Sequence, residues 1–390
     1  MQSLIKFAQK FKRYFSIIIY YPIAFIFKIL KIYVPHFIVE RIGHLASDPD
    51  SFLKEYYLQN QQFPFCILLA PSNFTANKKV AEYWGKYFLV IHSPIICRIL
   101  APLCFHPLLK SNEKYAAIIG STSSIYAINS KWVDKEPLLK INNEDLKIGK
   151  STLIELGLNE GDWFVCFHAR DGGYSPSDEH LHSFRNVPLE DYLQAIKFII
   201  SKGGKCIRMG DSSMRPAPKL DGLIDYALSP FKSEAMDIFL CSECLFFCGS
   251  NSGLYELAYV FGSHSVIPNM APMSLMPKGS NDIGIPMLYT HADSGELIDF
   301  KSVMQTSKSN FRSTKEFKDA GIELHRNNPS EILELVKEQY LRTKNIYSSK
   351  DTNQVLQKKY KSLFKDGHYS FGYASKIGED FLQRYSKLLP

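Results

Sequence analysis

The sequence lacks three loop signatures that identify large enzyme classes. It contains no G-x-x-x-x-G-K-[ST] phosphate loop, no G-x-G-x-x-G dinucleotide fingerprint and no G-x-S-x-G nucleophile elbow. The first two bring backbone amides to a phosphate, and the third exposes a nucleophilic serine. Their absence argues against a P-loop NTPase, an oxidoreductase with the dinucleotide fingerprint and an α/β-hydrolase.

Acidic residues are missing from residues 1–35, which contain six Lys and Arg. This segment therefore holds six of the seven net positive charges, and residues 36–390 carry only +1. A nearly neutral body does not present the basic surface that nucleic-acid binding requires. We expect no nucleic-acid partner.

The N-terminal apolar run is also short. Residues 14–27 are apolar but fall below the ~20 residues that cross a bilayer, and an extension to Val34 includes Lys28 and Lys31. A transmembrane helix, a helix lying in the membrane interface and a helix packed on the protein are the three alternatives, and Pro22 kinks the helix in each. We favour the interfacial helix, which places residues 1–35 on the membrane surface at the inner face of the cytoplasmic membrane.

The eight cysteines mostly lie in apolar runs, which is typical of reduced core thiols. Cys241-x-x-Cys244 with Cys248 has the spacing of half a zinc site or of a redox pair, but no second ligand pair accompanies it. We therefore predict no metal and no other cofactor. Reduced thiols without a convincing secretory signal predict a cytoplasmic protein.

Hydrophobic runs alternate with helical patterns along most of the chain, which predicts an α/β fold with parallel sheets. In the N-terminal half we expect a strand at 36–40, a turn at 41–46, a helix at 50–60 that Ser47-Asp48-Pro49 caps, strands at 65–69 and 89–92, and a helix at 78–88. Asp48-Pro-Asp50 matches a metal-binding Asp-x-Asp, but we interpret it as part of this cap.

The C-terminal half shows the alternation more clearly. We expect strands at 163–167, 205–209, 223–226, 245–248 and 265–268, helices at 189–202, 233–241 and 253–261, and a mostly helical tail at 330–345 and 352–389. The polar stretch 130–153 marks a boundary, so we divide the chain into four segments: 1–35, 36–150, 151–330 and 331–390.

Polar side chains follow three of these strands at the point where each ends. The strand at 163–167 ends in His168, Arg170 and Asp171, and similar patterns close the stretches 205–211 and 245–253. Because the carboxyl ends of parallel strands meet at one edge of a sheet, we expect one ligand-binding rim.

His168 and Arg170 are two residues apart and point to the same side of an extended chain. The planar fork of Arg170 suits a phosphate, so Arg170 is our first candidate for binding a departing diphosphate. Asp171 is a candidate catalytic base, or it holds Arg170 or a backbone turn. Arg185 is a second cation, unless it pairs with Asp178 or Glu179 on the surface. The loop 172–180 is expected to cover the substrate.

The stretch Ser250-Asn251-Ser252-Gly253 joins a strand to a helix, so its amides and hydroxyls form a candidate anion site, with Glu256 placed to accept from ribose hydroxyls. The alternative is that Ser252 only caps the helix.

Three further residues complete the candidate site. Arg208 is a third cation, and Asp211 is expected to bind sugar or base hydroxyls or to cap a helix. His44, expected at the first strand end of the N-terminal half, is the candidate for touching an acceptor and the alternative base.

These residues together resemble a family of uncharacterised bacterial glycosyltransferases over roughly 36–300. The matching motifs are Arg41-Ile-Gly-His-Leu45, Phe167-His-Ala-Arg-Asp-Gly-Gly-Tyr174, His182-Ser-Phe-Arg-Asn186, Ile207-Arg-Met-Gly-Asp211, Asp225-Tyr-Ala227 and Gly249-Ser-Asn-Ser-Gly253.

More distantly, His168-x-Arg170 with Pro188-Leu-Glu-Asp-Tyr192 is similar to the nucleotide-binding half of α-1,2- and α-1,6-fucosyltransferases. In that family the arginine matching Arg170 contacts the GDP diphosphate, and the fold is a metal-independent GT-B pair of Rossmann-like domains. Ala169 stands where that family has the first of two arginines, so the identity of the donor nucleotide does not carry over.

The resemblance implies a GT-B-like fold with two Rossmann-like domains and a central cleft, an N-terminal amphipathic or hydrophobic helix and a helical C-terminal tail. Segment 36–150 would be the acceptor side, and 151–330 would bind a nucleoside-diphosphate or CMP sugar. The expected activity is transfer of the sugar to a glycan or lipid-linked acceptor in bacterial surface polysaccharide synthesis. A catalytically silent nucleotide-sugar-binding or scaffold protein is the alternative, and a phosphosugar hydrolase or epimerase is a third.

Overall fold

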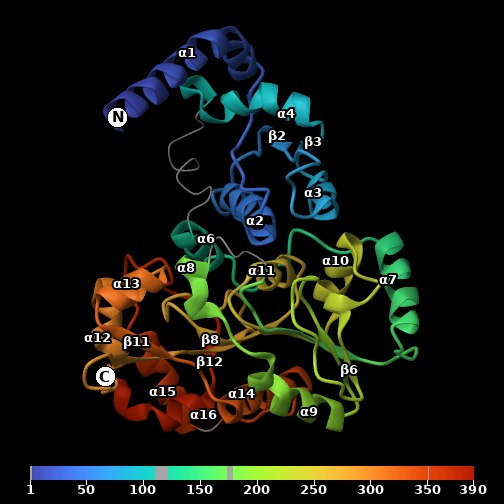
Figure 1. Ribbon diagram of the computed structural model, residues 1–390, viewed down its shortest axis with the longest axis vertical. Coiled ribbons are helices and arrows are strands. Elements are labelled where there is room, and N and C mark those ends of the chain that lie inside the picture. The colour runs from blue at the N-terminus through green and yellow to red at the C-terminus, as the bar shows by residue number, and fades with distance from the viewer. Residues whose placement is uncertain (1, 110–121, 174–178, 350) are drawn as a thin grey trace. The chain divides into compact units, whose positions relative to one another are not determined.

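The computed structural model describes residues 2–109, 122–173, 179–349 and 351–390 (Figure 1). The chain divides into two compact units, residues 1–128 and residues 129–390. The sequence-based boundary at residue 150 lies inside helix α7 (Asn143–Glu155), which packs against α10 (Glu234–Glu243) of the second unit. Gly149 permits this packing, since a Cβ there would lie 2.0 Å from the ring of Phe239.

The second unit is built on a seven-stranded sheet with the order β12-β9-β8-β7-β4-β5-β6, in which every neighbouring pair is parallel. The strands are β4 (Phe164–His168), β5 (Lys205–Arg208), β6 (Leu223–Ile224), β7 (Phe247–Gly249), β8 (Ser265–Met270), β9 (Ile283–Pro286) and β12 (Lys376–Ile377). From β4 the chain adds β5 and β6 on one side, and it then returns to add β7, β8 and β9 on the other. This is the strand order of a Rossmann fold, with its switch point between β4 and β7.

Helices cover both faces of this sheet, as expected for parallel strands (Figure 1). The helix α9 (Leu193–Ser201) packs on β5 and against α14 (Pro329–Thr343), which also contacts β8 and β9. On the other face α11 (Gly253–Val260) packs on β7 and β8 and contacts α10. Every residue of β4 is buried, so the hydrophobic run that predicted this strand lies in the centre of the core.

Local sequence signals explain where several helices begin and end. Ser233 caps α10 by accepting from the amide of Met236, as predicted. Asn328 and Glu331 form a capping box around Pro329 at the start of α14. The chain leaves α9 through Gly203, whose φ of +82° lies in the left-handed region that glycine tolerates.

All five strands predicted in the C-terminal half are confirmed, at β4 to β8. The predicted helix at 189–202 starts with a 3-10 turn, η5 (Leu189–Tyr192). The tail after residue 330 is not a separate helical appendage, because β12 extends the sheet and α14 packs on it. The sequence pattern missed β12 because a strand of two residues has no periodicity to detect.

The remaining elements of this unit surround the sheet and include a separate antiparallel pair, β10 with β11. They are α8 (Glu179–His182), η4 (Ser183–Arg185), η6 (Tyr226–Leu228), β10 (Leu288–His291), α12 (Phe300–Met304), η7 (Ser307–Asn310), α13 (Thr314–Asp319), β11 (Ile322–His325), α15 (Asp351–Lys361), α16 (Glu379–Arg384) and η8 (Ser386–Leu388).

The first unit contains a three-stranded parallel sheet in the order β1-β2-β3. Its elements are α1 (Gln2–Ile29), β1 (Ile32–Tyr33), α2 (Ile42–Leu58), β2 (Phe65–Leu69), α3 (Lys78–Trp84), β3 (Leu89–Ile91), α4 (Pro94–Leu100), η1 (Ala101–Phe105) and η2 (Pro107–Leu109), and α6 (Thr122–Asn129) ends at the division between the units. The predicted strands at 65–69 and 89–92 are confirmed. The strand predicted at 36–40 is wrong, since the strand lies earlier, at β1.

The predicted turn at 41–46 and the cap at 47–49 are also wrong, because α2 already begins at Ile42 and Pro49 lies inside it. A proline there has no amide hydrogen, so the carbonyl of Leu45 loses its helical partner. The indole of Trp84 donates to that carbonyl at 2.9 Å and replaces the missing bond. A tertiary contact therefore allows a helix where the local sequence predicted a helix start.

Residues 2–29 form the single helix α1, with Pro22 inside it. Within the part of the chain that the structure describes, no helix is both long enough and apolar enough to span a bilayer.

Candidate functional site

The carboxyl ends of β4 and β7 lie side by side at the switch point, with His168 paired to Gly249. A Cβ on Gly249 would lie 2.5 Å from the carbonyl oxygen of His168, so only glycine permits this close approach. The end of β5 is next to them, since Phe167 pairs with Arg208. The three strand ends that the sequence singled out therefore form one rim, here called the carboxyl edge.

His168 is buried at this edge and donates from Nδ1 to the backbone carbonyl of Met209 at 3.2 Å. Burial lowers its pKa to about 4, and the positive charge of Arg208 contributes to the shift. The imidazole is therefore neutral at pH 7 and cannot act as the cation of an anion site. With Nδ1 carrying the hydrogen, Nε2 is the acceptor, and it suits a sugar hydroxyl.

Arg170 follows β4, and its guanidinium lies among three oxygen groups. It forms an ion pair with Glu179 at 3.1 Å, donates to the side-chain oxygen of Asn186 and approaches the carbonyl of His182 at 3.4 Å. Asn186 in turn donates to Glu179 at 2.6 Å. Glu179 is therefore the carboxylate partner of Arg170.

The loop around Arg185 reaches the turn that follows β7. Arg185 donates to the carbonyl of Asn251, and the amide of Arg170 approaches the hydroxyl of Ser250 at 3.4 Å. Asp178, one of the two acids weighed as a surface partner of Arg185, lies outside the described residues. The fold brings together three of the predicted stretches, 168–171, 182–186 and 250–253. Residues 174–178 of the predicted cover are also outside the described ranges.

The turn before α11 carries two buried polar groups without a partner. Ser252 precedes the helix, but its side chain makes no capping hydrogen bond, so the capping alternative is wrong. In the described part of the chain the Ser252 hydroxyl and the side-chain nitrogen of Asn251 are both buried and have no hydrogen-bond partner. Both groups can donate, and they lie where the helix dipole is positive.

Two more buried donors lie along the same edge. Arg208 is 4% exposed and forms an ion pair with Asp225 at 2.8 Å, and its Nε has no partner among the described residues. Asn269 is 3% exposed near the end of β8, and its side chain hydrogen-bonds to the hydroxyl of Tyr192. Three buried donor groups, one from β5 and two from the turn after β7, therefore have no acceptor among the described residues at the carboxyl edge.

The carboxylates predicted for the site bind local partners. Asp171 accepts from the amide of Gly173 at 3.0 Å, and Asp211 accepts from the amide of Ser213 at 2.8 Å, so each holds a turn. Glu256 forms an ion pair with the buried ammonium group of Lys278. Asp171 and Asp211 both act electrostatically on His168, which places them at the same edge.

His44 belongs to the first unit and lies in the first turn of α2. Its Nδ1 is 3.1 Å from a carboxylate oxygen of Asp48. Asp50, the second carboxylate of the Asp-x-Asp pattern, forms a buried ion pair with Lys54 at 2.7 Å. Asp48 and Asp50 therefore lie within helix α2 and do not cap it.

The cysteines at 241, 244 and 248 are free thiols buried in the second unit, where burial raises the pKa of Cys241 and Cys248. Among the residues that the structure describes, no group of three or more His, Cys, Asp or Glu side chains is placed to hold a metal ion.

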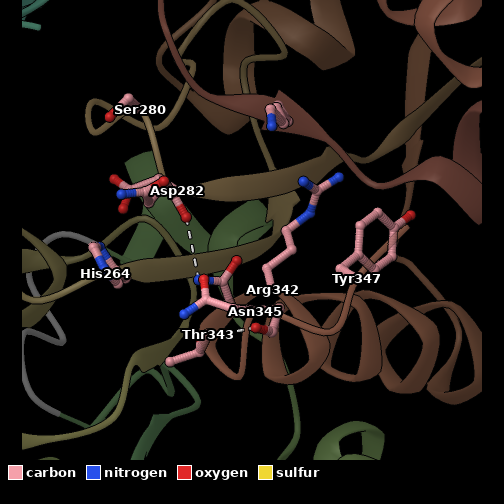
Figure 2. A pocket seen from close by; sticks show the side chains of 10 residues that line it. His264, Ser280, Asp282, Arg342, Thr343, Asn345 and Tyr347 are labelled. Atoms are coloured by element: carbon pink, nitrogen blue, oxygen red, sulfur yellow. Dashed lines mark hydrogen bonds between the residues drawn. The ribbon is translucent and has the colours of Figure 1, made fainter. Parts of the chain in front are cut away.

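A cavity of about 490 Å³ lies at the opposite edge of the sheet (Figure 2). It is at the amino ends of the strands, since His264 precedes β8, Asp282 precedes β9 and Lys376 begins β12. Arg342 extends from α14 into this region between Asp282 and Tyr347 (Figure 2). In a Rossmann fold, ligands bind at the carboxyl ends of the strands, so this cavity is not at the position that the topology favours.

Comparison with known proteins gives weak likenesses. No protein-family model matches the chain, and no curated protein matches it. A glycosyl transferase family 9 structure from Veillonella parvula DSM 2008 aligns with 80% of this chain and 97% of its own, at 11% identity and a TM-score of 0.44. The ADP-heptose LPS heptosyltransferase II of E. coli aligns with 62% of this chain and 85% of its own, at 10% identity and a TM-score of 0.36.

The iron-containing dodecameric heptosyltransferase TibC of enterotoxigenic E. coli H10407, in complex with ADP-D-beta-D-heptose, aligns with 61% of this chain. The alignment covers 57% of that protein, at 13% identity and a TM-score of 0.35. Such TM-scores and identities are too low for these likenesses to assign a family or an activity to this chain.

Sequence reasoning missed the partners of the predicted cations. Glu179 and Asn186 hold Arg170, Asp225 holds Arg208, and Asn269 adds a buried amide side chain from β8. Asn186 and Asp225 lie inside motifs that the resemblance had already marked, which was the available signal. Glu179 and Asn269 had none, because their roles depend on contacts between distant segments.

Proposed function

We propose that this protein is a glycosyltransferase that moves a sugar from a nucleoside-diphosphate or CMP sugar to a glycan or lipid-linked acceptor. The observation that carries the proposal is the group of buried donors at the carboxyl edge that have no acceptor among the described residues. A buried donor without an acceptor costs about 1–3 kcal/mol, so such groups persist where a ligand supplies the acceptor. The ligand expected there is rich in acceptor oxygens, as a diphosphate is.

Both Arg170 and the turn before α11 bind this anion. When the donor binds, its diphosphate replaces Glu179 as the partner of Arg170, while Asn251 and Ser252 donate at the positive end of α11. The same contacts stabilise the charge that develops on the leaving diphosphate as the acceptor hydroxyl attacks the anomeric carbon. Neutral His168 accepts from a hydroxyl of the donor, and Arg185 fixes the turn by holding the carbonyl of Asn251.

The remaining roles are assigned by position and resemblance. Asp171 is the proposed base with His44 as the alternative, Arg208 and Asp211 contribute to donor binding, and Glu256 faces the ribose. The first unit forms the acceptor side of a GT-B-like pair, and catalysis needs no metal. We place the enzyme at the inner face of the cytoplasmic membrane, where residues 1–35 bring it to a surface-polysaccharide intermediate.

Ser252→Ala tests the observation that carries the proposal. Because the hydroxyl is buried and has no partner in the described part of the chain, its removal should leave the melting temperature unchanged or slightly higher. The affinity for the matching nucleotide should fall about ten- to a hundredfold, the worth of one hydrogen bond to a charged group. Calorimetry with UDP, GDP, CMP and their sugars measures the affinity, and differential scanning fluorimetry measures the stability.

Ser263→Ala is the matched control, since that hydroxyl has a partner, the carbonyl of Ser242 at 3.0 Å. It should lower stability and leave nucleotide affinity unchanged. The donor-site assignment fails if no nucleotide binds, or if Ser252→Ala binds as the wild type does. Sugar transfer to an acceptor distinguishes an enzyme from a silent binding protein, and release of free sugar from the donor alone indicates a hydrolase.

A further inference from the structure

Helix α1 is apolar on two opposite faces from Ile17 to Leu30. Along one face Ile17, Tyr20, Ala24 and Phe27 recur at helical spacing, and three of them pack in the core of the first unit. The imidazole of His106 also bonds to the backbone carbonyl of Ile17 at 3.1 Å. These contacts hold α1 along the surface of the unit by one face.

The other face of α1 is exposed and equally apolar. Ile18 is 71% exposed, Ile26 53% and Ile29 63%, and Phe25 lies in the same stripe. The inner face of α1 is already packed against the unit. An exposed apolar face of this length is therefore typical of a surface that binds a partner.

A second exposed apolar group lies outside residues 1–35, on the short helix α4 and the turn after it. Ile95, Ile96 and Ile99 of α4 are 73%, 46% and 51% exposed, while Cys97 between them is buried. Phe105 of η1 is 56% exposed. Both α1 and α4 pack against η1, so the two apolar groups belong to the same part of the first unit (Figure 1).

The charges beside these groups have one sign. Residues 1–35 contain six basic residues and no acidic one, and Lys28, Lys31 and Arg98 are exposed beside the apolar side chains. Apolar side chains bordered by Lys and Arg match the interface of an anionic bilayer. A second copy of the same surface would bring like charges together, which disfavours self-association through it.

We propose that the first unit binds anionic membranes through two elements, α1 and the α4–η1 segment, and that the isoleucines of α4 insert beside α1. The docking surface is therefore part of the folded unit and not only of the N-terminal segment. This inference is independent of the donor site, because it uses no residue of the second unit.

Vesicle co-sedimentation of the full chain tests this surface, with vesicles of phosphatidylcholine alone and of phosphatidylcholine with phosphatidylglycerol. The variant Ile95→Asn/Ile96→Asn should reduce binding to the anionic vesicles at least about tenfold, since each buried isoleucine contributes about that factor. Lys28→Gln/Lys31→Gln should weaken binding to anionic vesicles and make it less sensitive to salt. Ile154→Asn is the control, because Ile154 is 61% exposed on α7 of the second unit, and it should bind as the wild type does.

Three outcomes overturn the proposal. The first is equal binding to neutral and anionic vesicles, and the second is wild-type binding by the α4 variant. The third is a variant that changes from dimer to monomer in light scattering while its binding to vesicles is unchanged. Nucleotide calorimetry on the α4 variant keeps the two proposals apart, since it should show wild-type affinity. A loss of vesicle binding with normal nucleotide binding is the expected pair of results.

Discussion

Charged side chains lie at both edges of the seven-stranded sheet, but the two edges differ in which buried polar atoms lack a hydrogen-bond partner among the described residues. At the amino edge Arg342 forms ion pairs with Glu338 at 2.6 Å and Glu379 at 3.3 Å, and it stacks on the ring of Tyr347 at 4.1 Å. Asp282 accepts from two backbone amides, each at 2.8 Å. Of the described side chains that line this cavity, Gln339 alone has a buried atom without a partner, and that atom is an acceptor.

At the carboxyl edge, the buried side-chain atoms without a hydrogen-bond partner among the described residues include donors of Arg208, Asn251 and Ser252, together with one carboxylate oxygen of Glu179, which is ion-paired with Arg170. An anion needs donors, so the carboxyl edge is the better candidate for a phosphate site. A cavity and a set of buried donors without acceptors are two separate signals, and our proposal of the donor site rests on the second, among the described residues. Each prediction below is directed at this contrast.

The largest expected effect is a pH dependence of stability that originates at His168. The pKa of His168 is about 4 in the folded protein, below its ordinary value of 6.5. Between pH 4 and pH 6.5 His168 therefore binds a proton in the unfolded chain but not in the folded chain. Its contribution is therefore fully present above pH 6.5 and is lost as the pH falls toward 4, by up to about 3 kcal/mol. His168→Gln should flatten the dependence in urea unfolding between pH 7 and pH 4.5. Parallel curves for wild type and variant would contradict a neutral His168.

The second prediction compares one arginine from each edge. Arg170→Ala should weaken nucleoside-diphosphate binding by about 1.5–3 kcal/mol, which is ten- to a hundredfold, because a charge-assisted contact is lost. Arg342→Ala should leave that affinity unchanged and lower stability, because it leaves Glu338 buried without its partner. Calorimetry and urea unfolding of both variants separate the two effects. If Arg342→Ala loses nucleotide binding and Arg170→Ala does not, the site lies at the amino edge.

The strand ends could be located from the sequence, because a fully buried parallel strand is a continuous apolar run and its polar residues mark its end. This worked for β4, β5 and β7, and it placed His168, Arg170 and Arg208 on one rim. It failed at α2, where Ser47-Asp48-Pro49 has a local pattern of a helix start. The contact between Trp84 and the carbonyl of Leu45 overrides that pattern, and nothing near Pro49 in the sequence encodes it.

The partners of the site residues could not be predicted for a similar reason. Asp171 was weighed as a partner of Arg170, but the fold places Glu179 and Asn186 against its guanidinium group. Ser252 was weighed as a cap, yet only the backbone geometry of the turn shows that its hydroxyl bonds to nothing in the described part of the chain. The residue types at strand ends can be identified from a sequence, whereas the hydrogen-bond partners of those residues are determined by the folded chain.

The third prediction has the opposite sign to that of Arg170→Ala. Glu179→Gln keeps the shape of the side chain but removes the carboxylate that competes with a diphosphate for Arg170. We expect nucleoside-diphosphate affinity to rise about three- to tenfold, since the ion pair is partly exposed and its disruption costs about 1 kcal/mol. Calorimetry on the variant beside Arg170→Ala measures this. Unchanged affinity would mean that Glu179 and the ligand do not share a partner.

The smallest expected effect is at Gln339, the residue at the amino edge with an unpartnered atom. Its side-chain nitrogen donates to the carbonyl of Asn281 at 3.1 Å, while Oε1 has no partner among the described residues. Gln339→Met has a similar volume and removes both groups, so the loss of one hydrogen bond nearly balances the removal of a buried acceptor. We expect a change in unfolding free energy below about 1 kcal/mol and no change in nucleotide affinity. A loss of affinity here would show that the cavity takes part in nucleotide binding, and it would remove the contrast between the two edges on which the assignment of the donor site depends.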